Sequence, residues 1–205
     1  TGVKKQEYCN ATTTGMVNTV TRTWDEEIIE KLGYKKELFG ELAQPGTVVG
    51  EFTDEVAAIV GYKAKVVLPA THDTASAVLA APAKGDFAYV SCGTWSLFGT
   101  ELPAPCITPE SERLQYTNEG GHSETTRFLR NIMGLWLIQE SRRQWRREGN
   151  EYSFAQMEAW AKECKPLQSL IDPDDASFAS PGNMPERIRE FCRRTGQHVP
   201  ESVGE

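Results

Sequence analysis

The chain has little cysteine, and the cysteines that it has form no pattern. Five are present, at positions 9, 92, 106, 164 and 192, and no two of them are separated by only two residues. Disulfide frameworks use even numbers of cysteines, and zinc sites use closely spaced pairs. The pattern therefore argues against both and indicates free thiols.

Long apolar runs and an excess of positive charge are also lacking. No stretch approaches the roughly 20 apolar residues that would span a bilayer, and no charged and then apolar leader opens the chain. The 22 Lys and Arg residues are outnumbered by 29 Asp and Glu residues, which gives a net charge of −7. Dedicated nucleic-acid binders need surplus cations to displace counterions from phosphates. We therefore expect a cytoplasmic protein with neither nucleic acid nor a membrane as a partner.

The remaining composition is that of a globular α/β protein. Hydrophobic residues make up 39% of the 205 positions and charged residues 25%, which is enough to bury a core. Apolar spacing and caps predict helices from Thr23 to Gly33, from Thr53 to Gly61, over residues 131–147, from 154 to 161 and from Pro185 onward. Strands are expected at 65–69, where the strand should be buried, at 114–118, and in a hairpin over 87–102. The Pro- and Gly-containing segment 82–86 predicts a domain boundary.

Residues 72–99 hold the strongest candidate site. Asp73 follows a histidine and a predicted strand, which is where ligand-contacting groups lie in α/β sheets. Later, Gly93 would let a ligand approach the backbone closely beside the Thr94 hydroxyl, a surface suited to phosphate oxygens. Each of these two features also has a plainer structural interpretation. Asp73 could be only a helix N-cap, and Gly93–Thr94 could be only a turn.

Two charged clusters have structural interpretations. The arginines of residues 142–147 suit the C-terminal end of a helix, where they face the negative end of its dipole, although a nucleic-acid contact is the alternative. The acidic run 172–175 could suggest calcium, but it lacks the glycine and the final glutamate of an EF-hand loop. A capped turn is therefore expected there, and we expect no metal site.

Four blocks in order carry a resemblance to a known family. They are HDTASAV at 72–78, SCGTWSL at 91–97, TNEGG at 117–121 and NIMGLWLIQ at 131–139. The chain resembles the FGGY carbohydrate kinases over nearly its whole length. The particular residues of these blocks are typical of family members that phosphorylate L-rhamnulose. The resemblance implies an actin-like, ribonuclease-H-like α/β fold. Residues 1–82 would be the C-terminal part of the sugar-binding domain, and 83–205 the N-terminal part of the nucleotide-binding domain.

The same resemblance implies the reaction and the residues on the sugar side. Asp73 would be the base that takes the proton from the C1 hydroxyl of the sugar, and His72 and Thr74 would contact the sugar beside it. Asn131 would be a further substrate contact. Phosphoryl transfer needs a carboxylate within hydrogen-bond reach of the attacking hydroxyl, and otherwise mostly positioning and charge neutralisation.

On the nucleotide side, the resemblance implies MgATP as the second substrate, with Mg²⁺ carried by the nucleotide. Gly93 and Thr94 would hold its phosphates, and Gln139 would contact the nucleotide. Asn131 and Gln139 would lie two turns apart on one face of the helix predicted at 131–147. The oligomeric state is left open.

The chain also departs from the family's pattern. It has no Asp-x-Gly phosphate loop, no later glycine-rich adenosine segment, and Cys92 where a small polar residue is expected. We therefore expect the 205 residues alone to be inactive. Two alternatives stay open, another FGGY kinase acting on fuculose or a pentulose, and a non-catalytic actin-like nucleotide-binding module.

Overall fold

Two units make up the chain, and each is assembled from segments that are apart in the sequence. A computed structural model describes residues 1–205. Unit 1 consists of Thr1–Ser91 and Leu97–Arg130, and unit 2 of Cys92–Ser96 and Asn131–Glu205. The predicted boundary at 82/83 does not coincide with this division, because residues 83–91 and 97–102, which include most of the predicted hairpin, belong to unit 1.

Short strands and helices form the first part of unit 1. β1 pairs in parallel with β4, while β2 with β3 and β5 with β6 pair antiparallel. The elements are β1 (Gln6–Glu7), α1 (Tyr8–Thr12), β2 (Val17–Asn18), β3 (Thr23–Trp24), α2 (Glu26–Lys31), η1 (Lys36–Leu38), β4 (Leu42–Ala43), β5 (Val48–Glu51), α3 (Asp54–Val60) and β6 (Lys65–Val67).

Local caps decide where α2 and α3 begin. The prediction for α3 is confirmed, since the Thr53 side chain accepts from the Val56 N–H and Gly61 ends the helix at a φ of 85°. For α2 the predicted cap is wrong. Thr23 is paired in β3, and the Asp25 side chain caps the helix by accepting from the Ile28 N–H at 3.0 Å.

The buried strand predicted at 65–69 is a strand with largely exposed side chains. β6 belongs to a two-stranded antiparallel ribbon with β5, and Val67 is 49% exposed. A short apolar run does not distinguish a buried strand of a parallel sheet from one strand of such a ribbon. Asp73 therefore follows an irregular loop after a two-stranded ribbon, and the predicted position just beyond the end of a buried strand in an α/β sheet is wrong.

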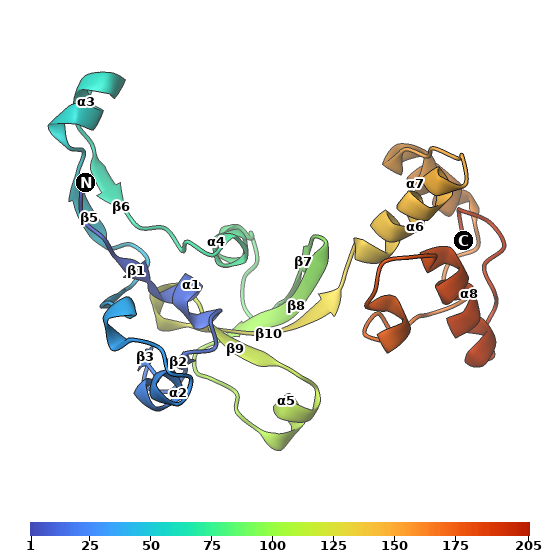
Figure 1. Ribbon diagram of the computed structural model, residues 1–205, viewed down its shortest axis with the longest axis horizontal. Coiled ribbons are helices and arrows are strands. Elements are labelled where there is room, and N and C mark those ends of the chain that lie inside the picture. Colours follow the sequence, from blue (N-terminus) through green and yellow to red (C-terminus); the bar gives the residue numbers. More distant parts are fainter. The chain divides into compact units, whose positions relative to one another are not determined.

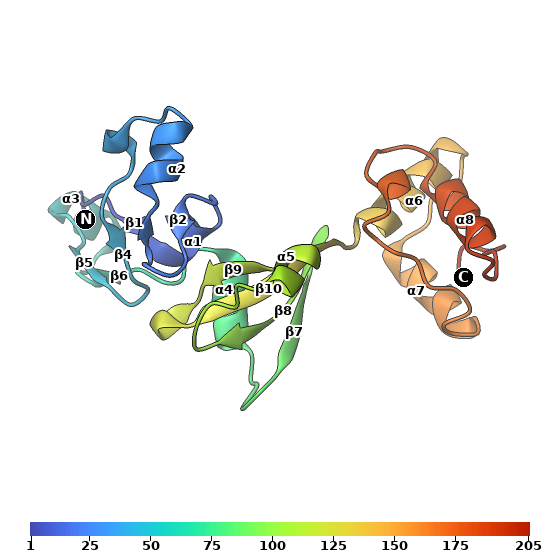
Figure 2. The same ribbon diagram turned by 90° about the horizontal axis from the view of Figure 1, so that it is seen from below.

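A four-stranded sheet follows, with the strand order β7-β8-β10-β9. The predicted hairpin at 87–102 is confirmed, while the strand predicted at 114–118 begins at Thr117, after a helix that was not predicted. α4 lies on one face of this sheet (Figures 1 and 2). The elements are α4 (Asp73–Ala80), β7 (Ala88–Cys92), β8 (Trp95–Leu102), α5 (Pro109–Arg113), β9 (Thr117–Gly120), η2 (His122–Glu124) and β10 (Thr126–Met133).

The predicted helix at 131–147 is half wrong. Residues 126–133 form β10, which pairs antiparallel with β9, and the helix begins only at Trp136. The apolar spacing around 132–139 fits a helix, but Gly134 interrupts it, and the strand pairs with a distant segment that local spacing does not reveal.

Helices dominate unit 2 and enclose its core. The predicted helices near 154 and 185 are confirmed, the first with a Ser153–Gln156 capping box. Leu137, Phe178, Met184 and Phe191 form the buried cluster. The elements are α6 (Trp136–Arg147), α7 (Phe154–Glu163), η3 (Ala176–Phe178) and α8 (Met184–Arg194). None of the helices in either unit has the length and apolarity needed to cross a bilayer.

Candidate active site

Asp73 stands at the first position of α4 with its carboxylate open to solvent. The side chain is 98% exposed. Its Oδ1 accepts from the Thr74 N–H at 2.7 Å, and Oδ2 has no protein partner. The N-cap of α4 is His72, which makes no side-chain capping bond, so Asp73 does not serve as the N-cap. An exposed carboxylate with a free oxygen can accept a proton from a substrate hydroxyl.

Glu7 holds the loop that leads to Asp73, and sequence reasoning missed it. Its carboxylate accepts from the backbone N–H of Cys9 at 2.7 Å, of Asn10 at 3.1 Å and of Thr71 at 3.0 Å, and from the Thr71 hydroxyl at 2.8 Å. Burial by itself would raise the pKa of Glu7, but these four hydrogen bonds together lower it. The ionised carboxylate thus ties α1 to the residue two positions before Asp73.

A core cluster also packs the segment around Asp73. Tyr8, Cys9, Ala70 and Ala75 are buried against one another. Burial raises the pKa of the Cys9 thiol to about 12, with the Glu7 carboxylate adding to the effect. All five cysteines are free, and Cys9 is therefore a packed, unreactive thiol.

His72 is joined to a buried arginine on the sheet. Arg127 is 1% exposed, and its Nη2 lies 3.2 Å from His72 Nδ1 and donates to Glu119 Oε2 at 2.9 Å. Its Nε donates to Gly120 O at 3.0 Å. Neither Arg127 nor Glu119 was a predicted site residue, because the sequence gives no sign that these charges are buried together.

The predicted base Asp73 and two of the predicted sugar contacts, His72 and Thr74, are consecutive in the chain but differ in access. Thr74 is 7% exposed, and its hydroxyl lies 3.5 Å from Asp73 Oδ1. Asn131 is exposed on β10. It therefore does not share a helix face with Gln139, and that prediction is wrong because the helix starts five residues later.

The hairpin tip brings two of the predicted nucleotide contacts together. Gln139 Nε2 lies 3.5 Å from Thr94 Oγ1. The N–H groups of Leu135 and Trp136 donate to the carbonyls of Gly93 and Thr94 at 2.9 and 3.2 Å. Gly93's own N–H donates to Trp95 O at 2.9 Å, so the amide expected to face phosphate is engaged within the turn.

Gly134 makes this contact possible. A Cβ added there would lie 2.7 Å from Gly93 O and 2.8 Å from Ser96 N, and it would also meet Ser96 Oγ. Its N–H donates to Thr94 O at 3.2 Å. Only glycine permits this approach between the start of α6 and the hairpin tip.

The two charged clusters have local partners. Arg142 lies over the Phe154 ring at 4.6 Å, Arg143 pairs with Glu140, and Arg146 pairs with Glu151 at 3.1 Å. These contacts match the expectation of an arginine-rich helix end.

In the acidic run, Asp175 accepts from the Ser177 N–H at 3.0 Å and pairs with Arg194 at 2.8 Å, as a capped turn requires. The Arg194 guanidinium and the Ser177 hydrogen bonds lower the pKa of Asp175 to about 2. No group of three or more His, Cys, Asp or Glu side chains is placed to hold a metal ion.

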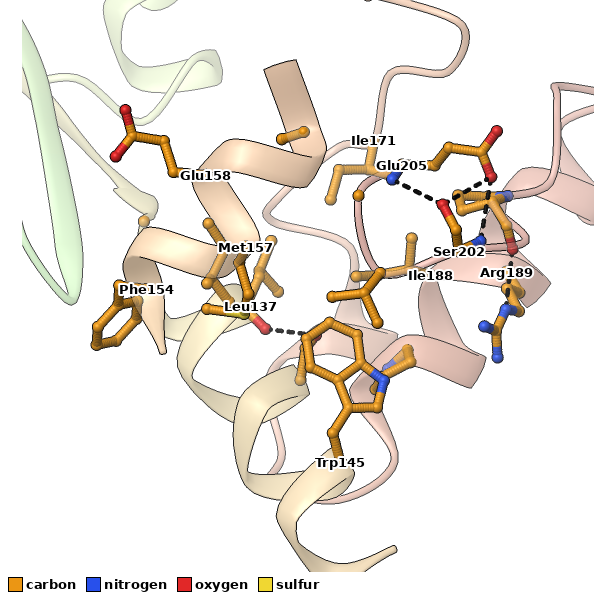
Figure 3. Close-up of a pocket in the computed structure, with 18 residues that line it drawn as sticks. Leu137, Trp145, Phe154, Met157, Glu158, Ile171, Ile188, Arg189, Ser202 and Glu205 are labelled. Carbon is orange, nitrogen blue, oxygen red and sulfur yellow. Dashed lines mark hydrogen bonds between the residues drawn. The ribbon is translucent and has the colours of Figure 1, made fainter. Parts of the chain in front are cut away.

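A cavity with a volume of about 680 Å³ lies elsewhere in unit 2. Figure 3 shows Leu137 and Trp145 of α6, Phe154 and Met157 of α7, and Ile188 of α8 around it. Its lining is mostly apolar, and it includes neither Thr94 nor Gln139.

Comparisons with known proteins agree over the whole chain. The model of the FGGY family of carbohydrate kinases, N-terminal domain, matches residues 1–80, and that of the C-terminal domain matches residues 88–205. A rhamnulokinase from Halalkalibacterium halodurans is 45% identical over 205 residues, which are 100% of this chain and 43% of that protein. A rhamnulokinase from Bacteroides thetaiotaomicron is 45% identical over 207 residues, 100% of this chain and 42% of that protein.

Solved structures show the same fold at lower identity. A xylulose kinase from Lactobacillus acidophilus has a TM-score of 0.64 and 22% identity, with 82% of this chain and 34% of that chain covered. A structure described as a xyloylose kinase from Brucella ovis has a TM-score of 0.63 and 16% identity, with 97% and 47% covered. The chain thus spans about two fifths of the length of the curated relatives that it matches.

Proposed function

Because this chain belongs to the FGGY family of carbohydrate kinases, we propose that the protein transfers the γ-phosphoryl group of ATP to the C1 hydroxyl of L-rhamnulose. The products are L-rhamnulose 1-phosphate and ADP. The fold is the actin-like, ribonuclease-H-like α/β fold expected from the sequence. The rhamnulokinases that are 45% identical over the whole chain support the choice of sugar.

Asp73 carries the chemical part of the proposal. Its exposed carboxylate accepts the proton of the sugar's C1 hydroxyl, whose oxygen then forms the bond to the γ-phosphorus while the bond from that phosphorus to the bridging oxygen of ADP breaks. The single observation that supports this role is the 98% exposed side chain with an unpartnered Oδ2 at the start of α4. His72, Thr74 and Asn131 contact the sugar.

Gly93, Thr94 and Gln139 form the nucleotide side of the proposal. The 3.5 Å contact between Thr94 and Gln139 supports a shared role at the phosphates, with the hydroxyl and the amide as donors. Gly93 contributes close approach of the backbone. Mg²⁺ fits this chain as an ion carried by ATP, because no acidic cluster here would hold it alone and Mg²⁺ binds through substrate phosphates. When bound, it neutralises charge on the transferred group.

We assign residues 1–82 to the sugar-binding domain and 83–205 to the nucleotide-binding domain, as supported by family models that match 1–80 and 88–205. The five free cysteines are in keeping with a reducing compartment, and we place the reaction in the cytoplasm.

The test is an ADP-release assay on the full-length protein with a panel of ketoses that includes L-rhamnulose, fuculose and pentuloses. We expect the highest kcat/KM with L-rhamnulose. Asp73→Asn should lower kcat by about 10²- to 10⁴-fold, the usual contribution of a positioned base. The 205-residue chain, assayed in parallel, should give no turnover, because it covers 43% of the length of a relative that matches it throughout.

Asp86→Asn is the matched control, since Asp86 is an exposed aspartate of the 82–86 linker. It should leave kcat unchanged. Turnover of another ketose in preference to L-rhamnulose would refute the sugar assignment, and an Asp73→Asn enzyme as active as the Asp86→Asn enzyme would refute the assignment of the base.

A further inference from the structure

The side chain of Arg127 is buried and held from several directions. It is 1% exposed on β10, its Nε donates to Gly120 O at 3.0 Å, and its Nη2 donates to Glu119 Oε2 at 2.9 Å. Glu119 is itself only 11% exposed. A guanidinium fixed by a carboxylate and a carbonyl has little freedom to rotate, so the remaining contact of Nη2, with His72, is fixed as well.

The contact with His72 determines which ring nitrogen carries the proton. Arg127 Nη2 lies 3.2 Å from His72 Nδ1, and a guanidinium can only donate hydrogen bonds. Nδ1 must therefore accept, which leaves the proton of the neutral ring on Nε2. The opposite tautomer would aim an Nδ1–H at the guanidinium. The carboxylate oxygen beside it, Glu119 Oε2, is 3.8 Å away, beyond hydrogen-bond distance, and already accepts from Arg127.

His72 Nε2 lies next to the carboxylate of the proposed base. Nε2 lies 3.7 Å from Asp73 Oδ1, and 23% of the His72 side chain is exposed. A substrate oxygen next to Asp73 would therefore meet a hydrogen-bond donor at this ring. A sugar hydroxyl or carbonyl oxygen can accept from it.

We propose that Arg127 is a positioning residue that fixes His72 in the Nε2–H tautomer, with Glu119 holding Arg127 in place. The inference rests on the proposed function, because it specifies what His72 presents to the sugar. His72 donates to a substrate oxygen beside the base and does not accept there. Arg127 itself does not touch the substrate.

The direct test observes the tautomer in the full-length enzyme without substrate. Histidine is labelled with ¹⁵N in the ring, and long-range ¹H–¹⁵N spectra report which nitrogen is protonated. The His72 signals are those that disappear in His72→Gln. We expect Nδ1 at the position of an unprotonated nitrogen and Nε2 at that of a protonated one. A protonated Nδ1, or an even mixture of tautomers, in the wild-type enzyme would overturn the proposal.

The variant Arg127→Lys provides a second test of the role of Arg127. A lysine keeps the positive charge beside Glu119, but its single ammonium cannot form the fork that reaches Gly120, Glu119 and His72 together. We expect the tautomers to mix and the KM for L-rhamnulose to rise by roughly tenfold, the equivalent of one hydrogen bond, with the KM for ATP unchanged. Arg113→Lys, on the exposed helix α5, is the matched control and should change neither.

The outcomes separate this proposal from the proposed function. An unchanged tautomer in folded Arg127→Lys would contradict the role of Arg127, whatever the activity. If Arg127→Lys does not fold, the wild-type spectrum still tests the predicted tautomer of His72. The expected tautomer in an enzyme that does not turn over L-rhamnulose would contradict only the function, and turnover with the opposite tautomer would contradict only the positioning.

Discussion

Replacing Gly134 by alanine should separate the nucleotide side of the reaction from the sugar side. The new Cβ would lie 2.7 Å from Gly93 O and 2.8 Å from Ser96 N, against roughly 3.4 Å for ordinary contact, so the hairpin tip or the start of α6 must move by about half an ångström or more. Such overpacking destabilises by about 1–3 kcal/mol. The movement would also disturb the Thr94–Gln139 contact, which is already long at 3.5 Å.

The assay compares KM values for ATP and L-rhamnulose in the full-length enzyme. We expect the KM for ATP to rise by about tenfold, the equivalent of roughly 1.4 kcal/mol, and the KM for the sugar to change little. Hydrogen exchange should show weaker protection of the amides of Leu135 and Trp136, which donate to the hairpin carbonyls. Gly40→Ala is the matched control, because the nearest atom to its Cβ, Gln6 Oε1, is 3.5 Å away. If both variants bind ATP as the wild type does, the assignment of the hairpin tip to the nucleotide is refuted.

Three further predictions concern charge and reactivity. The pKa of Glu7 is lowered on folding by hydrogen bonds that outweigh burial. The stability that the Glu7 carboxylate contributes is therefore complete at neutral pH and is lost as pH falls through its folded-state pKa. Glu7→Gln should flatten the acid side of a plot of urea midpoint against pH, and an unchanged plot would contradict this. Asp175, with a folded-state pKa of about 2, contributes stability that is lost between roughly pH 4 and pH 2, and Asp175→Asn should remove that slope from thermal melts. Iodoacetamide should label the exposed Cys92 well before the buried Cys9, whose pKa is about 12, as mass spectrometry of timed samples would show; equal rates would contradict the packing.

Elements with signals close in sequence were predictable. The Thr53 cap and the Gly61 stop define α3 within a few residues, and the two residues between the apolar runs around Gly93 define a hairpin. The same holds for the order of the four blocks that carry the family resemblance. In each case the residues that determine the structure are neighbours in the chain, so spacing and turn chemistry suffice.

Features that depend on distant partners were not predictable. The segment that ends at Met133 has helical spacing, yet it forms a strand because it pairs with β9 and lies next to β8 in the sheet. Arg127 and Glu119 look like ordinary surface charges, since nothing local indicates that adjacent strands bury them together. Asp73 was picked out from the sequence, but the arginine that contacts the neighbouring histidine was not. Sequence reasoning thus singled out the residue proposed as the base and missed the buried charges that pack beside it.

The Glu7–Thr71 contact also has a consequence for the order of folding. Its two partners are 64 residues apart, so the loop before Asp73 gains these hydrogen bonds only after a long segment of chain has closed on itself. Closing such a segment loses chain entropy before any contact compensates for it, which makes non-local contacts slow to form. The ribbon of β5 and β6 and helix α3 lie within that segment and can form first. The loop that presents the proposed base is therefore expected to become ordered late, when most of unit 1 is already in place.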